Sequence, residues 1–201
     1  MKRALALAMI LSTGAPTAAV LAQEPVTATR TSQTILLVGL VQPALFGGAN
    51  LALTHLGRRV SVTWSHGMWL HLSRVPALLD ATDRRAGFSV YSPWTTGLGV
   101  GLRAGSRSDI RLELKAHRYT VTGADGVATR YTTFSAGPGV YRRKALGTSG
   151  VLELSVRWWP NVASTLPGGR APLTARDGTT AIHRPYAHGL IANISIGIVI
   201  P

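Results

Sequence analysis

Alternation of side-chain type with a period of two residues limits what this chain can fold into more than any other feature of its sequence. From His188 to Ile200, large apolar side chains occupy alternate positions, and the positions between them are mostly small or polar. Successive side chains of a β-strand point to opposite faces, so this pattern predicts a strand with one apolar face. The same pattern recurs over 59–73, 96–104, 109–121, 130–142 and 151–159.

Two further strands are predicted nearer the N-terminus, where the signal is weaker. Residues 34–41 are almost wholly apolar, and 49–56 form a short run. A helix through this region is the alternative, but Pro43 and the Gly47-Gly48 pair disfavour an unbroken helix. The count then comes to about eight strands.

The connections between these strands alternate strictly between short and long. Short turns are expected at 57–58, 105–108 and 144–149, and longer loops at 42–48, 74–95, 122–129 and 160–187. An up-and-down barrel with tight turns at one rim and long loops at the other has this rhythm. The sequence therefore predicts an all-β fold, an up-and-down antiparallel β-barrel of about eight strands.

The start of the chain has the features of a signal peptide. The basic pair Lys2-Arg3 precedes an uncharged apolar stretch, and Ala22 supplies a small residue for cleavage. A transmembrane anchor is the alternative, but the helix breakers Gly14 and Pro16 favour cleavage. We expect a signal peptide over 1–22 that is cleaved near Ala22, a short periplasmic segment over 23–33 and a barrel domain over 34–201.

Composition narrows the chemistry and the partners. The chain has no cysteine, which excludes thiol catalysis and thiolate metal sites. Its formal charge is +13, or 13 − 2 = +11 without Lys2 and Arg3. Nucleic-acid binding is one explanation of such a charge. The export signal and the placement of basic residues in turns and loops instead favour anionic lipid and lipopolysaccharide as partners, with no nucleic acid.

Alternation alone does not say which face of the barrel is apolar. A soluble lipocalin-like barrel puts its apolar residues inside, whereas an outer-membrane barrel points them at lipid. The polar face of this chain is rich in Gly, Ser and Thr, and its charges have both signs, which suits pairing in a narrow lumen. We therefore predict a transmembrane barrel in the cell outer membrane. Its interior polar network is expected to contain Arg103, Arg111, Glu113, Lys115, Glu153 and Arg157.

Aromatic residues cluster where the predicted strands meet the long loops. Outer-membrane barrels carry such a girdle of aromatic side chains at the membrane interface. The expected members are Trp69, Tyr119, Tyr131, Phe134, Trp158, Trp159 and Tyr186. Strands of roughly ten residues are also long enough to cross the hydrocarbon at the usual tilt.

With these features, the chain resembles the small outer-membrane β-barrel proteins of the OmpA/OmpX type over most of its length after the signal peptide. The resemblance is architectural, because it rests on the alternation and the loop rhythm. It implies a Gram-negative envelope, insertion by the barrel assembly machinery, periplasmic turns, and loops 74–95 and 160–187 outside the cell. The basic groups Arg58-Arg59 and 142–144 would then lie near the inner-leaflet head groups. The last strand resembles the family's C-terminal assembly signal, with Ile200-Pro201 where an aromatic residue is usual.

Barrels of about eight strands have interiors just wide enough to be filled by side chains. We therefore expect a structural or surface-interaction role, with loops 74–95 and 160–187 available to a partner, and no wide porin-like pore. A soluble periplasmic lipocalin-like carrier of an apolar ligand is one alternative.

A lipid-modifying enzyme is the other alternative. Lipid A deacylases of the outer membrane carry a His-x-Ser pair and a Glu on the outside of a barrel, because a base must lie beside the hydroxyl nucleophile. His66-Gly67-Met68 lacks the serine, and His71-Leu72-Ser73 has it on the face predicted to point inward. Enzymatic activity is therefore left open and not favoured, and no catalytic residue is assigned.

Neither a metal nor a cofactor is assigned. His71, His117 and His188 lie near the predicted loop rim, but they have no ligand spacing that supports a metal site. Gly97, Gly99 and Gly101 lie within a strand rather than between a strand and a helix, so a phosphate-binding loop is not expected.

Overall fold

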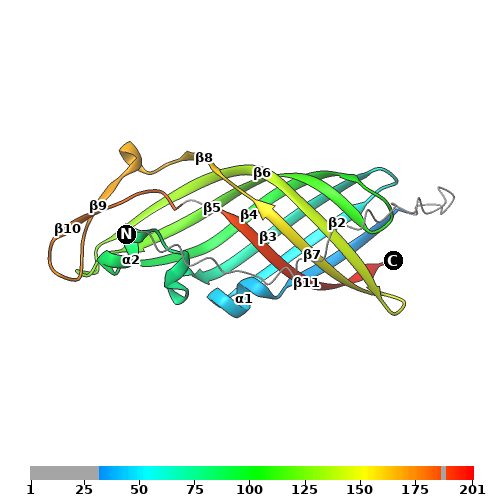
Figure 1. The fold of residues 1–201 in the computed structure, drawn as a ribbon, viewed down its shortest axis with the longest axis horizontal. Helices are drawn as coiled ribbons and strands as arrows, with labels where there is room; N and C mark the ends of the chain where they lie inside the picture. The colour runs from blue at the N-terminus through cyan, green and yellow to red at the C-terminus, as the bar shows by residue number, and fades with distance from the viewer. Residues whose placement is uncertain (1–31, 187–188) are drawn as a thin grey trace, which may run out of the picture.

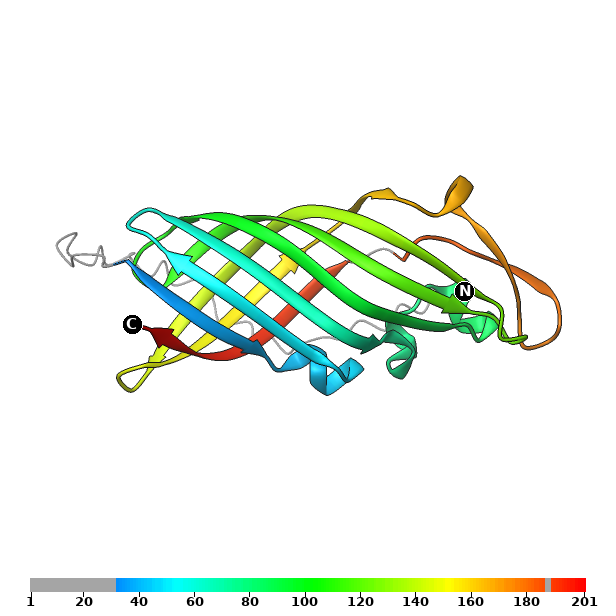
Figure 2. The same ribbon diagram turned by 180° about the vertical axis from the view of Figure 1, so that it is seen from behind.

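Eight antiparallel strands close into a barrel in the computed structural model, which describes residues 32–186 and 189–201. The barrel strands are β1 (Gln33–Gly39), β2 (Ala49–Leu56), β3 (Val60–His71), β4 (Ser89–Arg103), β5 (Ser108–Thr122), β6 (Ala128–Leu146), β7 (Gly150–Trp158) and β11 (Leu190–Ile200). Each strand pairs with its neighbour in this order, and β11 pairs with β1 to close the ring (Figures 1 and 2). The all-β, up-and-down barrel expected from the sequence is confirmed. The predicted signal peptide and residues 23–31 lie outside the described residues.

The two ends of the barrel differ, as the alternation of short and long connections predicts. At one end, the strands are joined only by the short turns 57–59, 104–107 and 147–149. The opposite end carries the other elements, with β10 and α2 far from the C-terminus (Figure 1). These elements are α1 (Val41–Phe46), η1 (Leu72–Arg74), η2 (Pro76–Leu78), α2 (Ala81–Ala86), β8 (Asn161–Ser164), η3 (Pro167–Gly169), β9 (Ala171–Thr174) and β10 (Thr180–His183). We call these ends the turn end and the loop end.

The barrel wall is apolar outside and polar inside. On β5, Ile110 and Leu112 are 56% and 61% exposed, whereas Arg111 and Glu113 between them are 1% and 2% exposed. In a water-soluble protein the placement is the opposite, with apolar side chains inside and charged ones outside, because charged groups are costly to bury and apolar surface is costly to expose to water. The alternation therefore runs in the direction that a membrane barrel requires. Within the described part of the chain, no helix is long and apolar enough to cross a membrane.

One strand departs from simple alternation. In β3, Trp69 has a φ of 61°, in the left-handed region that side chains other than glycine rarely occupy. Continued through 59–73, the alternation of the sequence puts Leu70 and Leu72 on the outer face with Val60 and Val62, and Trp69 on the inner face, but the structure shows the reverse. Trp69 is 57% exposed, and Leu70 and Leu72 are each only 5% exposed. The left-handed residue reverses the facing of the positions that follow it, while the pairing of β3 with β4 keeps its register from Met68 to His71. The register shift in this region lies in the pairing of β4 with β5, between Tyr91 and Thr95.

Gly48, immediately before β2, closely approaches the backbone of Met68 and Trp69. Its φ is 79°, and a Cβ atom there would collide with the carbonyl oxygen of Met68. Only glycine allows the two backbones to approach so closely at this point.

An apolar cluster closes the loop end of the barrel. Strands β3 to β6 extend past the other strands, and the segment between β7 and β11 folds back against their inner face (Figure 2). We call this segment, residues 160–186, the lid. The buried cluster consists of Leu70, Leu72, Leu79, Ala86, Phe88, Val90, Tyr119, Val121, Tyr131, Leu166, Ala171, Leu173 and Ala175. A smaller cluster near the turn end contains Ile35, Leu37, Leu56 and Val151.

Candidate functional site

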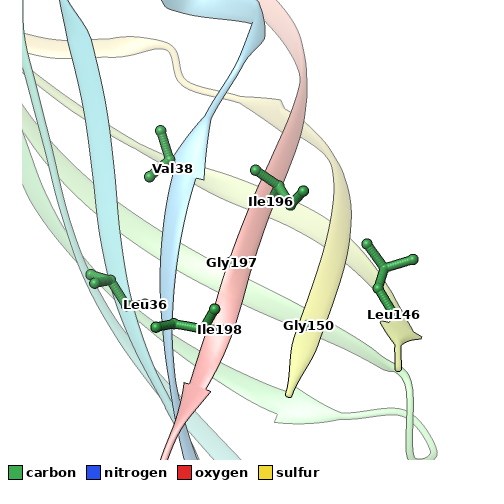
Figure 3. A pocket seen from close by; sticks show the side chains of 7 residues that line it. All are labelled: Leu36, Val38, Leu146, Gly150, Ile196, Gly197 and Ile198. Carbon is green, nitrogen blue, oxygen red and sulfur yellow. The ribbon is translucent and has the colours of Figure 1, made fainter. Parts of the chain in front are cut away.

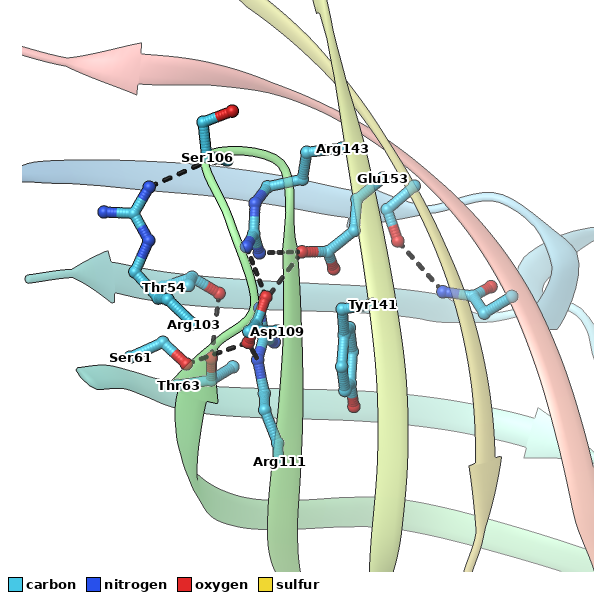
Figure 4. A network of polar contacts seen from close by, with 12 residues as sticks. Thr54, Ser61, Thr63, Arg103, Ser106, Asp109, Arg111, Tyr141, Arg143 and Glu153 are labelled. Atoms are coloured by element: carbon cyan, nitrogen blue, oxygen red, sulfur yellow. Dashed lines mark hydrogen bonds and ion pairs between the residues drawn. The ribbon is translucent and has the colours of Figure 1, made fainter. Parts of the chain in front are cut away.

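Four charged side chains form a closed ring inside the barrel. Asp109 and Arg111 come from β5, Arg143 from β6 and Glu153 from β7 (Figure 4). Arg111 pairs with Asp109 and lies 3.2 Å from Glu153, measured from Nη2 to Oε2. Arg143 pairs with Asp109 and lies 3.0 Å from the same Glu153 oxygen. Each guanidinium thus contacts both carboxylates, and we call this set the ionic ring.

Strand register brings the members of the ionic ring together. Arg143 on β6 lies directly opposite Glu153 on β7, and inward positions recur every second residue. The Ser61 hydroxyl on β3 donates to Asp109 across 2.8 Å. All four charged side chains are at least nine-tenths buried. Buried charges persist only where partners and hydrogen bonds offset their desolvation, and the ring supplies two partners to each member.

A second polar group fills the lumen beside the ring. The Tyr141 hydroxyl donates to Glu113, and the Lys115 Nζ atom lies 3.9 Å from the second Glu113 oxygen. Lys115 also donates to the hydroxyl of Ser65. The guanidinium of Arg111 stacks over the Tyr141 ring, 3.7 Å from its centroid. The aromatic ring and the methylene groups of these side chains therefore fill the lumen between the charged groups.

The space left inside the barrel is small. One interior cavity of about 20 Å³ is lined by residues of both polar groups, among them Arg111, Glu113, Tyr141 and Arg157. A volume of that size admits about one water molecule. The lumen is therefore filled at this level and cannot hold an apolar ligand.

The structure buries five of the six residues expected in the interior network: Arg111, Glu113, Lys115, Glu153 and Arg157. Arg103 is different, because it lies at the end of β4, only partly buried. It donates to the carbonyl oxygens of Gly57 and Ser106, at 2.7 and 3.1 Å. Arg103 therefore ties two turns together.

Sequence reasoning missed two members of the ionic ring, Asp109 and Arg143. Residues 142–144 were expected together near the lipid head groups, but Arg143 is only 6% exposed and points inward. Continuing the alternation of β6 beyond Tyr141 would have found it, since Tyr141 and Arg143 share a face.

The expected aromatic girdle is only partly at the surface. Trp69, Phe134 and Trp158 are 57%, 42% and 52% exposed on the outer wall. By contrast, Tyr119 and Tyr131 are fully buried, Trp159 is 3% exposed, and Tyr186 packs against the apolar cluster under the lid. The expectation was wrong for these four residues. The lid covers the inner face of the extended strands, so aromatic side chains near the rim can point inward and be shielded from water.

Three buried polar side chains connect the lid to the barrel. His183 of β10 lies between Asp83 of α2 and Tyr131 of β6. Its Nδ1 atom is 2.9 Å from Asp83 Oδ1, and its Nε2 atom is 2.9 Å from the Tyr131 hydroxyl oxygen. The amide of Tyr186 donates to the same hydroxyl across 3.0 Å. We call Asp83, His183 and Tyr131 the lid relay, which no sequence spacing revealed.

The lid relay has the order of groups found in hydrolases, a carboxylate, an imidazole and a hydroxyl. All three side chains are at most 1% exposed, so no substrate can reach the hydroxyl in this arrangement. The Tyr186 hydroxyl, which donates to the Leu78 carbonyl oxygen across 2.9 Å, is held in the same region. Burial raises the pKa of Tyr186 to about 12, so it stays protonated and keeps this bond. The relay therefore holds the lid in place.

The other candidate residues do not assemble into a site. The His71 ring lies against Tyr91, tilted by 33° with ring centroids 4.6 Å apart, whereas His117 is buried beside the Thr95 hydroxyl. His188 lies outside the described residues. Within the described ranges, no three His, Asp or Glu side chains gather closely enough to hold a metal ion.

The two histidines considered for a deacylase-like pair also have other neighbours. His66 stacks on Trp64 at a centroid distance of 5.9 Å. The Ser73 hydroxyl accepts a hydrogen bond from the amide of Val90 across 2.6 Å. Ser73 is thus engaged with the backbone of β4, and the structure offers no base–nucleophile pair here.

Comparison with known proteins adds little to this picture. No protein-family model and no curated protein matches the sequence. Among solved structures, the chain is similar to the crystal structure of a major outer membrane protein from Thermus thermophilus, with 12% sequence identity and a TM-score of 0.48. The match covers 85% of this chain and 100% of that chain.

Proposed function

We propose that this protein is a closed outer-membrane barrel with a structural or surface-interaction role, and that it does not conduct solutes. The observation that carries the proposal is the filled lumen. The ionic ring and its neighbours leave a cavity of only about 20 Å³. The lid then covers the loop end with an apolar cluster. A barrel closed twice in this way serves as a rigid anchor in the membrane.

Membrane residence is supported by the outer wall. Outward side chains such as Leu98, Leu112 and Leu114 are about three-fifths exposed, with values of 59%, 61% and 61%. A band of this kind favours lipid over water as the surrounding solvent. By resemblance to small outer-membrane barrels, the turn end would lie in the periplasm and the lid outside the cell.

Lipopolysaccharide is the partner that the loop end suits best. Arg118 of β5 and Arg130 of β6 lie on the outer face of paired strands, beyond Phe134 toward the loops. Arg118 donates to the Thr132 hydroxyl across 3.2 Å, which holds its guanidinium close to the wall. Arginine side chains on the outer wall near the loop end can bind phosphate groups of the outer leaflet through charge-assisted hydrogen bonds.

Neither alternative function has an observation in its favour. An apolar-ligand carrier needs an apolar cavity, and the interior here is charged and filled. A deacylase needs an accessible base beside a hydroxyl, and the two His motifs lack one.

Conductance in planar lipid bilayers tests the proposal. The refolded mature protein is expected to give no steady single-channel current, while a general porin in the same bilayer gives large steps. A large, steady current from correctly folded protein would overturn the proposal of a closed barrel.

A further inference from the structure

A lipid-sized groove lies on the outer wall at the turn end, where the first and last strands of the barrel meet. Its volume is about 470 Å³, within the range of pockets that bind small ligands. Figure 3 shows Leu36 and Val38 of β1 beside Ile196 and Ile198 of β11. The remaining lining residues are Leu146, Gly150 and Gly197. No polar side chain lines it.

Gly150, which has no side chain, lies in the lining of the groove, where the backbone of Leu146 approaches too closely for a Cβ atom. Gly150 lies on the outward face of β7, directly opposite both Leu146 of β6 and Ile198 of β11. The outer wall is therefore low at Gly150, and the branched apolar side chains of Leu146 and Ile198 flank it on the two neighbouring strands.

Two cations lie beside the groove. Arg142 and Lys144 are exposed on the outward face of β6, four and two residues before Leu146. Lys144 lies opposite Leu152, the outward residue next to Gly150 on β7. Both side chains have long apolar stems that let the charge reach the membrane–water boundary.

The outer wall offers these cations no carboxylate. The acidic residues on the described barrel strands are Asp109, Glu113 and Glu153, and all three are buried inside. A positively charged rim next to an apolar groove complements a molecule with a negative head and an apolar tail. An anionic phospholipid has that chemistry, with its acyl chain in the groove and its phosphate at Arg142 and Lys144.

We infer that this groove binds one anionic phospholipid of the periplasm-facing leaflet, preferentially over zwitterionic phospholipid. The inference rests on the proposed membrane residence and orientation of the barrel. The bound lipid would cover the junction between β1 and β11, the two strands that close the barrel.

Native mass spectrometry of the folded barrel in detergent micelles, titrated separately with phosphatidylglycerol and phosphatidylcholine, tests the inference. We expect one retained phosphatidylglycerol, bound about tenfold more tightly than phosphatidylcholine, since each cation near an anionic lipid strengthens binding several-fold. Glycerol phosphate should not displace it, because it has no acyl chain. Equal affinity for the two lipids, or displacement by glycerol phosphate, would overturn the inference.

Matched variants separate head-group from acyl-chain recognition. Arg142→Gln with Lys144→Gln should abolish the preference, whereas Arg59→Gln with Arg107→Gln removes the same charge from exposed turn residues and should leave it intact. Val38→Trp should fill the groove and weaken binding of both lipids, unlike Val62→Trp on the outer face of β3. Equal effects of test and control variants would contradict a site.

The failure of this inference can be told apart from the failure of the proposed function. Fractionation of cells that express the protein reports membrane residence independently. A protein found in the membrane fraction without lipid preference contradicts only the groove, whereas a soluble periplasmic protein contradicts both proposals.

Discussion

At the scale of single residues, neighbouring positions on one strand have opposite surroundings. Arg142 and Arg143 are adjacent in sequence, but Arg142 is exposed on the outer wall and Arg143 completes the ionic ring. Loss of one partner from a buried pair leaves an uncompensated charge, which costs far more than loss of a surface charge. The same substitution at the two sites therefore compares the two environments directly.

We expect Arg143→Met to lower the free energy of unfolding by about 3–5 kcal/mol, because Asp109 and Glu153 each lose a partner. Arg142→Met, the control, should change it by about 0.5 kcal/mol or less. Urea unfolding of the barrel in lipid vesicles measures both. The double variant Arg143→Met, Glu153→Met should be more stable than Arg143→Met alone. Equal effects at positions 142 and 143 would contradict the ionic ring.

The backbone at Trp69 offers a second test at this scale. A residue with a side chain in the left-handed region costs about 1–2 kcal/mol, and glycine avoids that cost. Trp69→Gly and Trp69→Ala remove the same indole, but only glycine relieves the backbone. We expect Trp69→Gly to be the more stable variant by about 1 kcal/mol in the same unfolding assay. An alanine variant as stable as the glycine variant would argue against a left-handed backbone at position 69.

At the scale of elements, the lid is held to the barrel by specific contacts as well as by apolar packing. The lid relay joins α2, β10 and β6. Exposed bonds contribute too: the Thr174 hydroxyl of β9 donates to Asp125 in the β5–β6 loop across 2.6 Å. That bond lowers the pKa of Asp125, so its contribution is present near neutral pH and is lost as the pH falls through this lowered pKa.

His183→Ala is expected to loosen the lid and leave the barrel folded. The substitution leaves Asp83 and Tyr131 buried without their shared partner, a cost of about 1–3 kcal/mol. Protease cleavage within residues 160–186 should accelerate about tenfold, because opening becomes more frequent. His71→Ala, which changes an exposed histidine on β3, should have no such effect. Unchanged cleavage in His183→Ala would contradict a role for the relay in holding the lid.

At the scale of the whole molecule, the closed ring of strands has no free edge in its hydrogen bonding. Each barrel strand pairs on both sides, and the outer wall is apolar. Such a barrel resists detergent, because detergent covers the wall without entering the hydrogen-bonded ring.

Electrophoresis without boiling should show the consequence. We expect the membrane-extracted mature protein to migrate as a compact band in dodecyl sulfate and to shift after boiling. The Arg143→Met variant should shift at a lower temperature than Arg142→Met. A single unshifted band from the soluble periplasmic fraction would mean that the wall does not face lipid.

Much of the barrel followed from local pattern. Period-two alternation located six of the eight barrel strands, because successive side chains of a strand point to opposite faces, and apolar runs located β1 and β2. Alternation also placed Arg111, Glu113, Lys115, Glu153 and Arg157 on one face. It failed at Trp69, where a single backbone angle reversed the phase for Leu70 and Leu72.

The sequence by itself determined the eight barrel strands, their order, and the short and long connections, since these depend on neighbouring residues. It did not reveal the short strands β8, β9 and β10 within the segment expected to be a loop. The tertiary structure alone decided which charges meet. Asp83 and His183 lie 100 residues apart, and Arg111 and Glu153 lie 42 apart. The tertiary structure also decided that the lid folds inward, so that Tyr119 and Tyr131, which were expected at the surface, belong to the buried apolar cluster. Such contacts depend on barrel closure and register across strands, and no local pattern encodes them.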